Sequence, residues 1–230
     1  MKPDETAGAI DVVRNARARR MKLAFDPASG RVRLVLPKRA RLEAGLAWAD
    51  EHRGWIDAQR AKLPQPRPFV PGAVIPLHGD DVLLEWRAGA LRTPHRVDGA
   101  LVVGGPRDVF EARVARWLKR EALRLLTIET SEYAAKAGVT VTRVGIGDAT
   151  SRWGSCASSG TIRYNWRLIL APAWVRRATV AHEVAHRVHM DHSRAFHAVV
   201  ASIYEGDPAP ARRWLRGHGA SLHWFGRAAS

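Results

Sequence analysis

The segment His182-Glu183-Val184-Ala185-His186, with the pattern H-E-x-x-H, constrains this chain more than any other feature. Residues four apart on an α-helix lie on one face, about 6 Å apart along the axis, so both imidazoles can reach one metal ion. Their nitrogen atoms suit Zn²⁺, which binds histidine at about 2.0–2.1 Å. Glu183 projects beside the pair, where a carboxylate can accept a proton from water bound to the metal. Chance alone produces this pattern in about two of 100 chains with this histidine content, so its surroundings must support it.

A catalytic zinc site usually has three protein ligands, so a third one is expected near this segment. We favour His192, six residues after His186. On a continuous helix His192 would point away from the other two histidines, so the chain must turn between them. Asp191 tolerates turn conformations and Ser193 can cap a following helix, so both residues favour such a turn.

Two other residues stay open as the third ligand. His189 shares the helical face of His182 but lies about 10 Å from it along the axis, which is long for one coordination sphere. Glu205 would suit a glutamate ligand on a later helix, although the sequence Glu205-Gly206-Asp207-Pro208 is typical of a helix end. The three preferred histidines have the spacing of H-E-x-x-H-x-x-G-x-x-H, except that His189 replaces the glycine of that pattern.

The composition indicates a globular protein of a reducing compartment. Of its 230 residues, 46% are hydrophobic and 26% are charged, which is ordinary for such a protein. No apolar run approaches the roughly 18 residues that span a bilayer, and the N-terminal residues include no apolar signal region. The single cysteine, Cys156, excludes an intrachain disulfide. We therefore expect a cytoplasmic protein with no membrane partner.

The charge is strongly basic, with 37 Lys and Arg against 22 Asp and Glu and a net charge of +15. Such an excess can bind nucleic acid through its phosphates. The arginines are spread along the whole chain, however, and no zinc-finger, helix-turn-helix or ribonucleoprotein motif is present. Charge alone therefore makes nucleic acid a candidate partner, beside a protein or peptide substrate.

The hydrophobic patterning predicts an α+β chain in three parts. Residues 1–17 resemble a flexible N-terminal arm, residues 18–105 a β-rich N-terminal domain, and residues 106–230 a mainly helical domain with a small sheet. The N-terminal domain is expected to contain a hairpin, one helix, a proline-rich connector and further strands, at residues 20–25 and 32–36, 42–63, 64–68, and 74–77, 82–86 and 101–103.

The last part is expected to open with a long helix over residues 109–137, capped by Asp108 and ended by Gly138. Two strand-like segments, 139–146 and 161–166, flank a loop of small residues at 151–160. The metal helix follows at 171–188, and further helices are expected around 193–204 and 209–215.

Three segments in this order resemble the YgjP-like metallopeptidase family: Arg152–Cys156, Ile162–Leu168 and His182–Phe196. The resemblance covers about residues 106–216. It implies a zincin-like catalytic domain with Zn²⁺ at His182, His186 and His192 and with Glu183 as the general base. The chain is also similar, more distantly, to SprT-like proteases, some of which act on proteins attached to DNA. Asp191 and His197 depart from the family pattern, which commonly has asparagine and tryptophan there.

The resulting hypothesis is zinc-dependent hydrolysis of peptide bonds. In zincin-like enzymes an edge strand near the metal helix can pair with extended substrate, and residues 163–166 are a candidate for it, although a core strand is the simpler interpretation. Two rival functions stay open: a non-catalytic zinc domain acting as a basic nucleic-acid adaptor, and a metal-dependent amidohydrolase acting on a non-peptide substrate.

Overall fold

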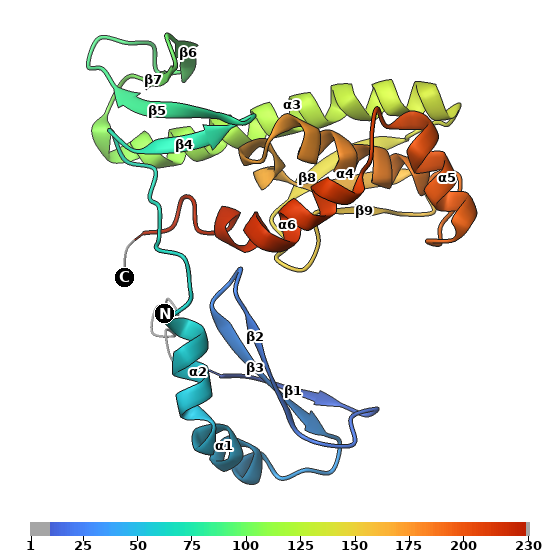
Figure 1. Cartoon of the computed structure of the whole chain (residues 1–230). Helices are drawn as coiled ribbons and strands as arrows, with labels where there is room; N and C mark the ends of the chain where they lie inside the picture. Colours follow the sequence, from blue (N-terminus) through green and yellow to red (C-terminus); the bar gives the residue numbers. More distant parts are fainter. Residues whose placement is uncertain (1–9, 229–230) are drawn as a thin grey trace. The chain divides into compact units, whose positions relative to one another are not determined.

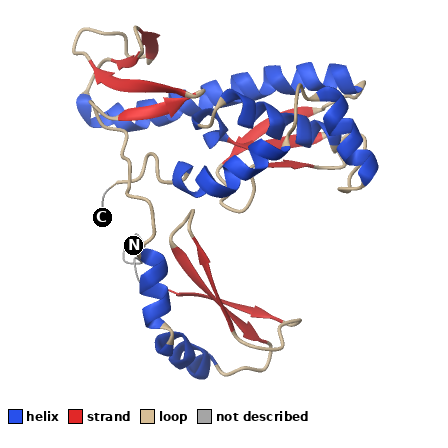
Figure 2. Ribbon diagram, viewed as in Figure 1, coloured by secondary structure: helices blue, strands red, loops and turns tan. Residues whose placement is uncertain are grey.

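The computed structural model describes residues 10–228 of the chain. The fold is mixed α+β, as predicted, and the described residues form six α-helices and three small sheets (Figure 2). The chain divides into two compact units, one ending at Gln65 and the other beginning at Pro66 (Figure 1). Each unit has its own hydrophobic core.

The first unit contains a three-stranded sheet in the order β1-β3-β2, with β1 at Ile10–Asn15, β2 at Lys22–Asp26 and β3 at Arg31–Pro37. Strands β2 and β3 are antiparallel, which confirms the predicted hairpin. Strand β1 pairs in parallel with β3, so residues 10–15 are a strand where we expected a flexible arm. Residues 1–9 of that arm lie outside the described residues.

Two short helices follow this sheet where one long helix was predicted. They are α1 at Leu42–Glu51 and α2 at Arg53–Arg60, and the backbone leaves helical geometry at His52 with φ −99° and ψ 15°. The ring of His52 donates from Nδ1 to the carbonyl of Trp48 at 2.8 Å. The core of this unit is small among the described residues, where its buried cluster consists of Leu34, Leu36 and Ala49.

The second unit opens with a four-stranded sheet in the order β4-β5-β7-β6. Its strands are β4 at Val74–Leu77, β5 at Asp80–Trp86, β6 at His95–Val97 and β7 at Ala100–Val103. The sequence did not indicate β6. Buried residues of these strands, such as Leu77 and Leu101, share one core with Phe110 and Leu118 of the next helix. Residues 66–105 therefore belong to the second unit by packing, whereas we had grouped them with the N-terminal strands.

The long helix is α3, at Phe110–Ala137, preceded by a 3₁₀ turn, η1, at Arg107–Val109. Asp108 lies inside this turn and the helix has no side-chain cap, so the predicted cap is wrong. Gly138 ends the helix in the left-handed region with φ 64°, as predicted.

A second small sheet has the order β8-β10-β9, with β8 at Arg143–Gly147, β9 at Gly154–Cys156 and β10 at Thr161–Asn165. Strand β10 is central, parallel to β8 and antiparallel to β9. Strand β9 lies within residues 151–160, where we had expected a loop without a strand. The inner face of the sheet is apolar, since Ile162 and Tyr164 are buried in the main core.

The remaining elements are η2 at Trp166–Leu170, a 3₁₀ segment, and the helices α4 at Ala173–Ala185, α5 at Arg194–Ile203 and α6 at Ala209–Leu222. Helix α4 packs against α3, α5 and α6, which places it at the centre of this unit (Figure 1). No helix within residues 10–228 is both long enough and apolar enough to cross a membrane.

Candidate metal centre

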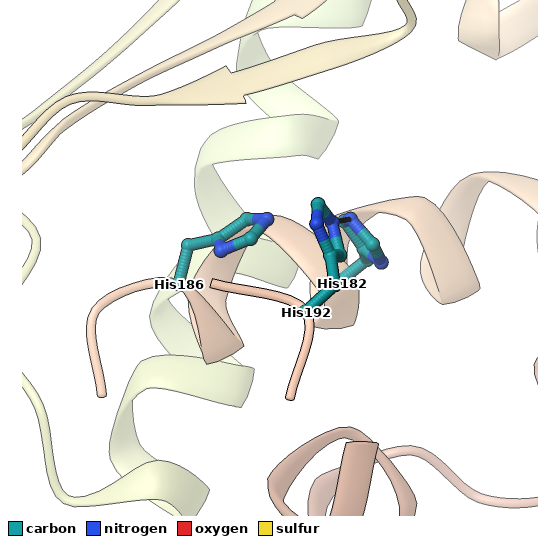
Figure 3. A group of neighbouring side chains, drawn as sticks. All are labelled: His182, His186 and His192. Carbon is teal, nitrogen blue, oxygen red and sulfur yellow. Dashed lines mark hydrogen bonds between the residues drawn. The ribbon is translucent and has the colours of Figure 1, made fainter. Parts of the chain in front are cut away.

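The structure brings His182, His186 and His192 together. One ring nitrogen from each lies within 4.8 Å of the others, and the Nε2 atoms of His182 and His192 are 3.2 Å apart (Figure 3). Helix α4 carries His182 in its last turn, and His186 immediately follows its end. The aromatic ring of Phe196 packs against all three imidazoles, with ring centroids 4.5–5.0 Å away.

A tight turn returns His192 to the end of α4. The carboxylate of Asp191 accepts a hydrogen bond from the backbone N–H of Ser193 at 3.0 Å. The hydroxyl of Ser193 then accepts from the N–H of Phe196 at 3.3 Å and caps α5. Asp191 and Ser193 therefore form the turn and the helix cap that the sequence predicted.

The separation of one nitrogen pair fits a tetrahedral metal ion such as zinc. Two nitrogen ligands at about 2.0–2.1 Å from a tetrahedral zinc lie about 3.3 Å apart, close to the 3.2 Å between His182 and His192. His186 donates from Nδ1 to the carbonyl of His189 at 3.0 Å, which fixes the ring and leaves Nε2 to bind a metal. Burial, followed by the neighbouring imidazoles, lowers the pKa of His182 to about 4. Burial also lowers the pKa of His186, and the neutral ring is the form that binds metal.

The alternative third ligands lie outside the histidine cluster. His189 contributes its backbone carbonyl to His186, and its ring is not part of the cluster. Glu205 accepts hydrogen bonds from Tyr133, at 3.1 Å, and from Lys136, both on α3. His197 is exposed on α5.

Glu183 lies beside the histidines in a cavity of about 280 Å³ that it shares with His182. The residue is only 6% exposed, and its carboxylate forms no hydrogen bond with any described residue. Burial raises the pKa of this carboxyl to about 7, and the cation of Arg152 opposes the rise. Glu183 is therefore a buried carboxylate that faces open space next to the candidate metal ligands.

Gly154 makes room for that carboxylate. A Cβ atom at this position would lie 2.5 Å from both Cγ and Oε1 of Glu183, which is closer than real atoms approach. Sequence reasoning did not assign this role to Gly154. The available signal was its place in the segment Arg152–Cys156, one of the three that carry the family resemblance.

The edge strand beside the site is β9, not the segment 163–166 that we had considered. That segment begins in β10, which has a neighbour on both sides. The N–H of Asn165 donates to the carbonyl of Trp153, and the N–H of Ala157 donates to that of Thr161. Hydrogen-bonded and non-hydrogen-bonded residue pairs alternate along an antiparallel ladder. The backbone N–H and C=O groups of Gly154 and Cys156 therefore point away from β10.

A buried ion pair attaches the metal helix to α3. Arg176 of α4 donates from Nε and Nη2 to Glu129 of α3 at 2.8–3.0 Å, and both side chains are 6% exposed. Arg176 also donates from Nη1 to Nδ1 of His78 at 3.1 Å. Burial, with the Arg176 cation next, lowers the pKa of His78 to about 4, so this ring is a neutral acceptor.

Comparison with known proteins agrees with this geometry. The family model described as YgjP-like, metallopeptidase domain, matches residues 19–218. The match extends the resemblance that we noted for residues 106–216 into the first unit. No curated protein and no solved structure matches the chain. A metallopeptidase domain implies a metal ion and a protein or peptide substrate. Since the match covers most of the chain, the chain belongs to the YgjP-like family of metallopeptidases.

Proposed function

We propose that this chain is a zinc peptidase in which His182, His186 and His192 hold the metal and Glu183 is the general base. One observation carries the proposal. Three imidazole nitrogens lie within 4.8 Å of one another, with one pair at the 3.2 Å that suits zinc, and a buried carboxylate without a hydrogen-bond partner among the described residues faces the cavity beside them. Structural zinc sites are usually closed by four protein ligands, whereas three ligands leave a position for a reactant.

The mechanism assigns a separate task to each group. Bound zinc would supply Lewis acidity, polarising the scissile carbonyl and making water more acidic. Glu183 accepts the proton of the attacking water and passes it to the leaving amine. The hydrogen bond from His186 to the carbonyl of His189 keeps that imidazole oriented. Gly154 keeps Glu183 in place by leaving the space that its side chain fills.

The edge of β9 offers a place for the substrate backbone. An extended peptide can add a strand to an exposed sheet edge through main-chain hydrogen bonds. The outward-facing groups of Gly154 and Cys156 supply such an edge, and Gly154 contacts Glu183 directly. A peptide bound there would pass beside the proposed base.

The proposal is tested with Glu183→Gln, which keeps the size of the side chain and removes the base. We expect elemental mass spectrometry to find near one equivalent of zinc in the wild type and in the variant. We expect hydrolysis of a mixed peptide pool, followed by mass spectrometry, to slow by about 100-fold or more in the variant. The matched metal control is His192→Ala, which should lose zinc as well as activity. Full activity of Glu183→Gln would overturn the mechanism.

One observation favours the nucleic-acid adaptor as a second candidate. A cavity of about 420 Å³ beside α3 is lined by five cations, Arg92, Arg113, Arg116, Lys119 and Arg120. None of the five forms an ion pair with a described residue. Steeply salt-dependent binding of DNA in the absence of any peptide hydrolysis would support this candidate over the first.

A further inference from the structure

The outer face of the sheet β8-β10-β9 carries arginines. The strand register places Arg143 beside Thr161, and Arg163 between Gly145 and Ser155. These five residues lie on one face of the sheet, because side chains alternate between the two faces along a strand. Both arginines are exposed, whereas the residues on the opposite face are packed into the core. The glycine and serine neighbours are small, so they leave the arginine side chains accessible.

The cations on the sheet have no acidic partner, because the side chains of Arg143 and Arg163 form no hydrogen bond or ion pair within residues 10–228. Arg152 forms no ion pair there either, although its cation acts on the carboxyl of Glu183. The acid that borders the sheet end, Asp148, is engaged by Arg167 at 2.8 Å. Unpaired cations with accessible donors attract anionic groups, and arginine matches the geometry of a carboxylate through two parallel hydrogen bonds.

The basic face continues into the candidate metal centre. A cavity of about 490 Å³ includes Arg143 and Arg163, and an adjoining one of about 280 Å³ lies over residues 147–154. The cavity beside His182 and Glu183 comes next. Arg152 lines all three cavities, so they follow one another along the start of β9.

The two ends of this row differ in chemistry. The cavity at the metal centre has mostly apolar walls, formed by Trp153, Ala178, Val200, Pro208, Ala211 and Leu215. Two cations, Arg152 and Arg212, also border it. The sheet end is lined by arginines and small polar residues. A matching ligand therefore has a bulky apolar group at one end and negative charge at the other.

We infer that the substrate is an acidic peptide segment that carries a bulky apolar side chain near the bond to be cut. This inference rests on the proposed peptidase function. The apolar side chain enters the cavity beside His182 and Glu183, and acidic side chains a few residues away meet Arg152, Arg163 and Arg143. A strand bound along β9 would present alternate side chains to this face.

The observations favour a peptide over a nucleic acid at this face. Single-stranded nucleic acid is bound by cations together with exposed aromatic rings on which bases stack. The aromatic side chains bordering these cavities are already packed. Tyr164 is buried, and Trp153 lies against Gly219 of α6 and against His223, at a ring separation of 5.1 Å. The cations also lead into an apolar cavity, which suits a side chain better than a phosphate.

The experiment measures binding in zinc-loaded Glu183→Gln, so that turnover does not interfere. Two fluorescein-labelled peptides are compared by anisotropy: one has a leucine flanked on both sides by aspartate and glutamate, the other by asparagine and glutamine. We expect the acidic peptide to bind at least about 10-fold more tightly. Arg143→Glu combined with Arg163→Glu should abolish this preference, and Arg163→Gln alone should reduce it.

The matched control is Arg116→Glu combined with Arg120→Glu on α3, which changes the net charge equally but outside this face. It should keep the preference. Equal affinities for the two peptides, or equal loss of preference in both double variants, would overturn the inference. Displacement of the acidic peptide by a single-stranded oligonucleotide at lower concentration than by unlabelled peptide would assign the face to nucleic acid and overturn it too. If the preference holds but zinc-loaded wild type cuts no peptide, the recognition stands and the proposed hydrolysis fails.

Discussion

Helix α4 and the turn after it, residues 186–193, both contribute histidines to the cluster, but different forces hold them in place. Helix α4 lies in the core, with Val180 and Val184 fully buried, and Arg176 pairs with a buried glutamate of α3. The turn is largely exposed, with Met190 at 56%, and local hydrogen bonds of single side chains shape it.

Because of this difference, we expect changes in α4 to affect the stability of the fold and changes in the turn to affect metal binding. The anchors of α4 belong to the main core, so a change there is expected to affect the whole second unit. The turn places His192 but supports little else, so a change there is expected to alter the metal site while the fold persists. Paired variants on the two sides test that division.

The largest effect is expected from Glu129→Ala. The substitution leaves the guanidinium of Arg176 buried without its charge partner, which typically costs about 3–5 kcal/mol of stability. The matched control is Glu132→Ala, because Glu132 also joins α3 to α4, through Arg177, but that pair is partly exposed. The control should cost less than about 1 kcal/mol. Urea unfolding followed by circular dichroism measures both, and similar small losses would show that the buried pair is not an anchor.

The next effect concerns catalysis rather than stability. Gly154→Ala places a Cβ atom where Glu183 now packs, so the carboxylate must leave its present position. We expect about a 100-fold loss of peptide hydrolysis with zinc content unchanged, because small displacements of a reacting group have effects of that size. Gly217→Ala on α6 is the control, since its Cβ would meet no atom within 4 Å and it lies outside the proposed substrate face. Unchanged hydrolysis by Gly154→Ala would mean that Glu183 does not need its present position.

Local patterns explain which parts of this site could be predicted. The spacing of His182 and His186 follows from helix geometry, and the turn between His186 and His192 follows from the local preferences of Asp191 and Ser193. Helix ends such as Gly138 are also local, and the structure confirms that one. These features depend on residues within one or two helical turns of each other.

The features that were missed depend on contacts between distant residues. Glu129 and Arg176 are far apart in the sequence, and no periodicity links a glutamate on one helix to an arginine on another. The role of Gly154 depends on the approach of Glu183 from α4. Strand β9 has only three residues, too few for a visible alternation. Each of these requires the tertiary arrangement, which sequence patterns within one segment do not contain.

The smallest effect is expected in the turn. Asp191→Ala removes the acceptor for the N–H of Ser193, so the turn that presents His192 loses its fixed shape. We expect zinc affinity to fall by about 10-fold, as for other groups that orient ligands, with stability reduced by only about 1 kcal/mol. Competition with a chelator of known affinity measures the first, and urea unfolding of the metal-free protein measures the second.

Two controls test whether zinc affinity depends on the shape of the turn. One removes the charge of Asp191, and the other removes a similar hydrogen bond at another helix start. Asp191→Asn keeps an acceptor oxygen while removing the negative charge, so it should retain most of the zinc affinity. Asp207→Ala removes an equivalent hydrogen bond, to the N–H of Ala209 at 2.8 Å before α6, away from the histidines. It should leave zinc affinity unchanged. If Asp191→Asn lost as much zinc affinity as Asp191→Ala, the charge of Asp191 rather than the geometry of the turn would support His192. That result would contradict the view that local hydrogen bonds shape the turn, whereas core packing holds α4.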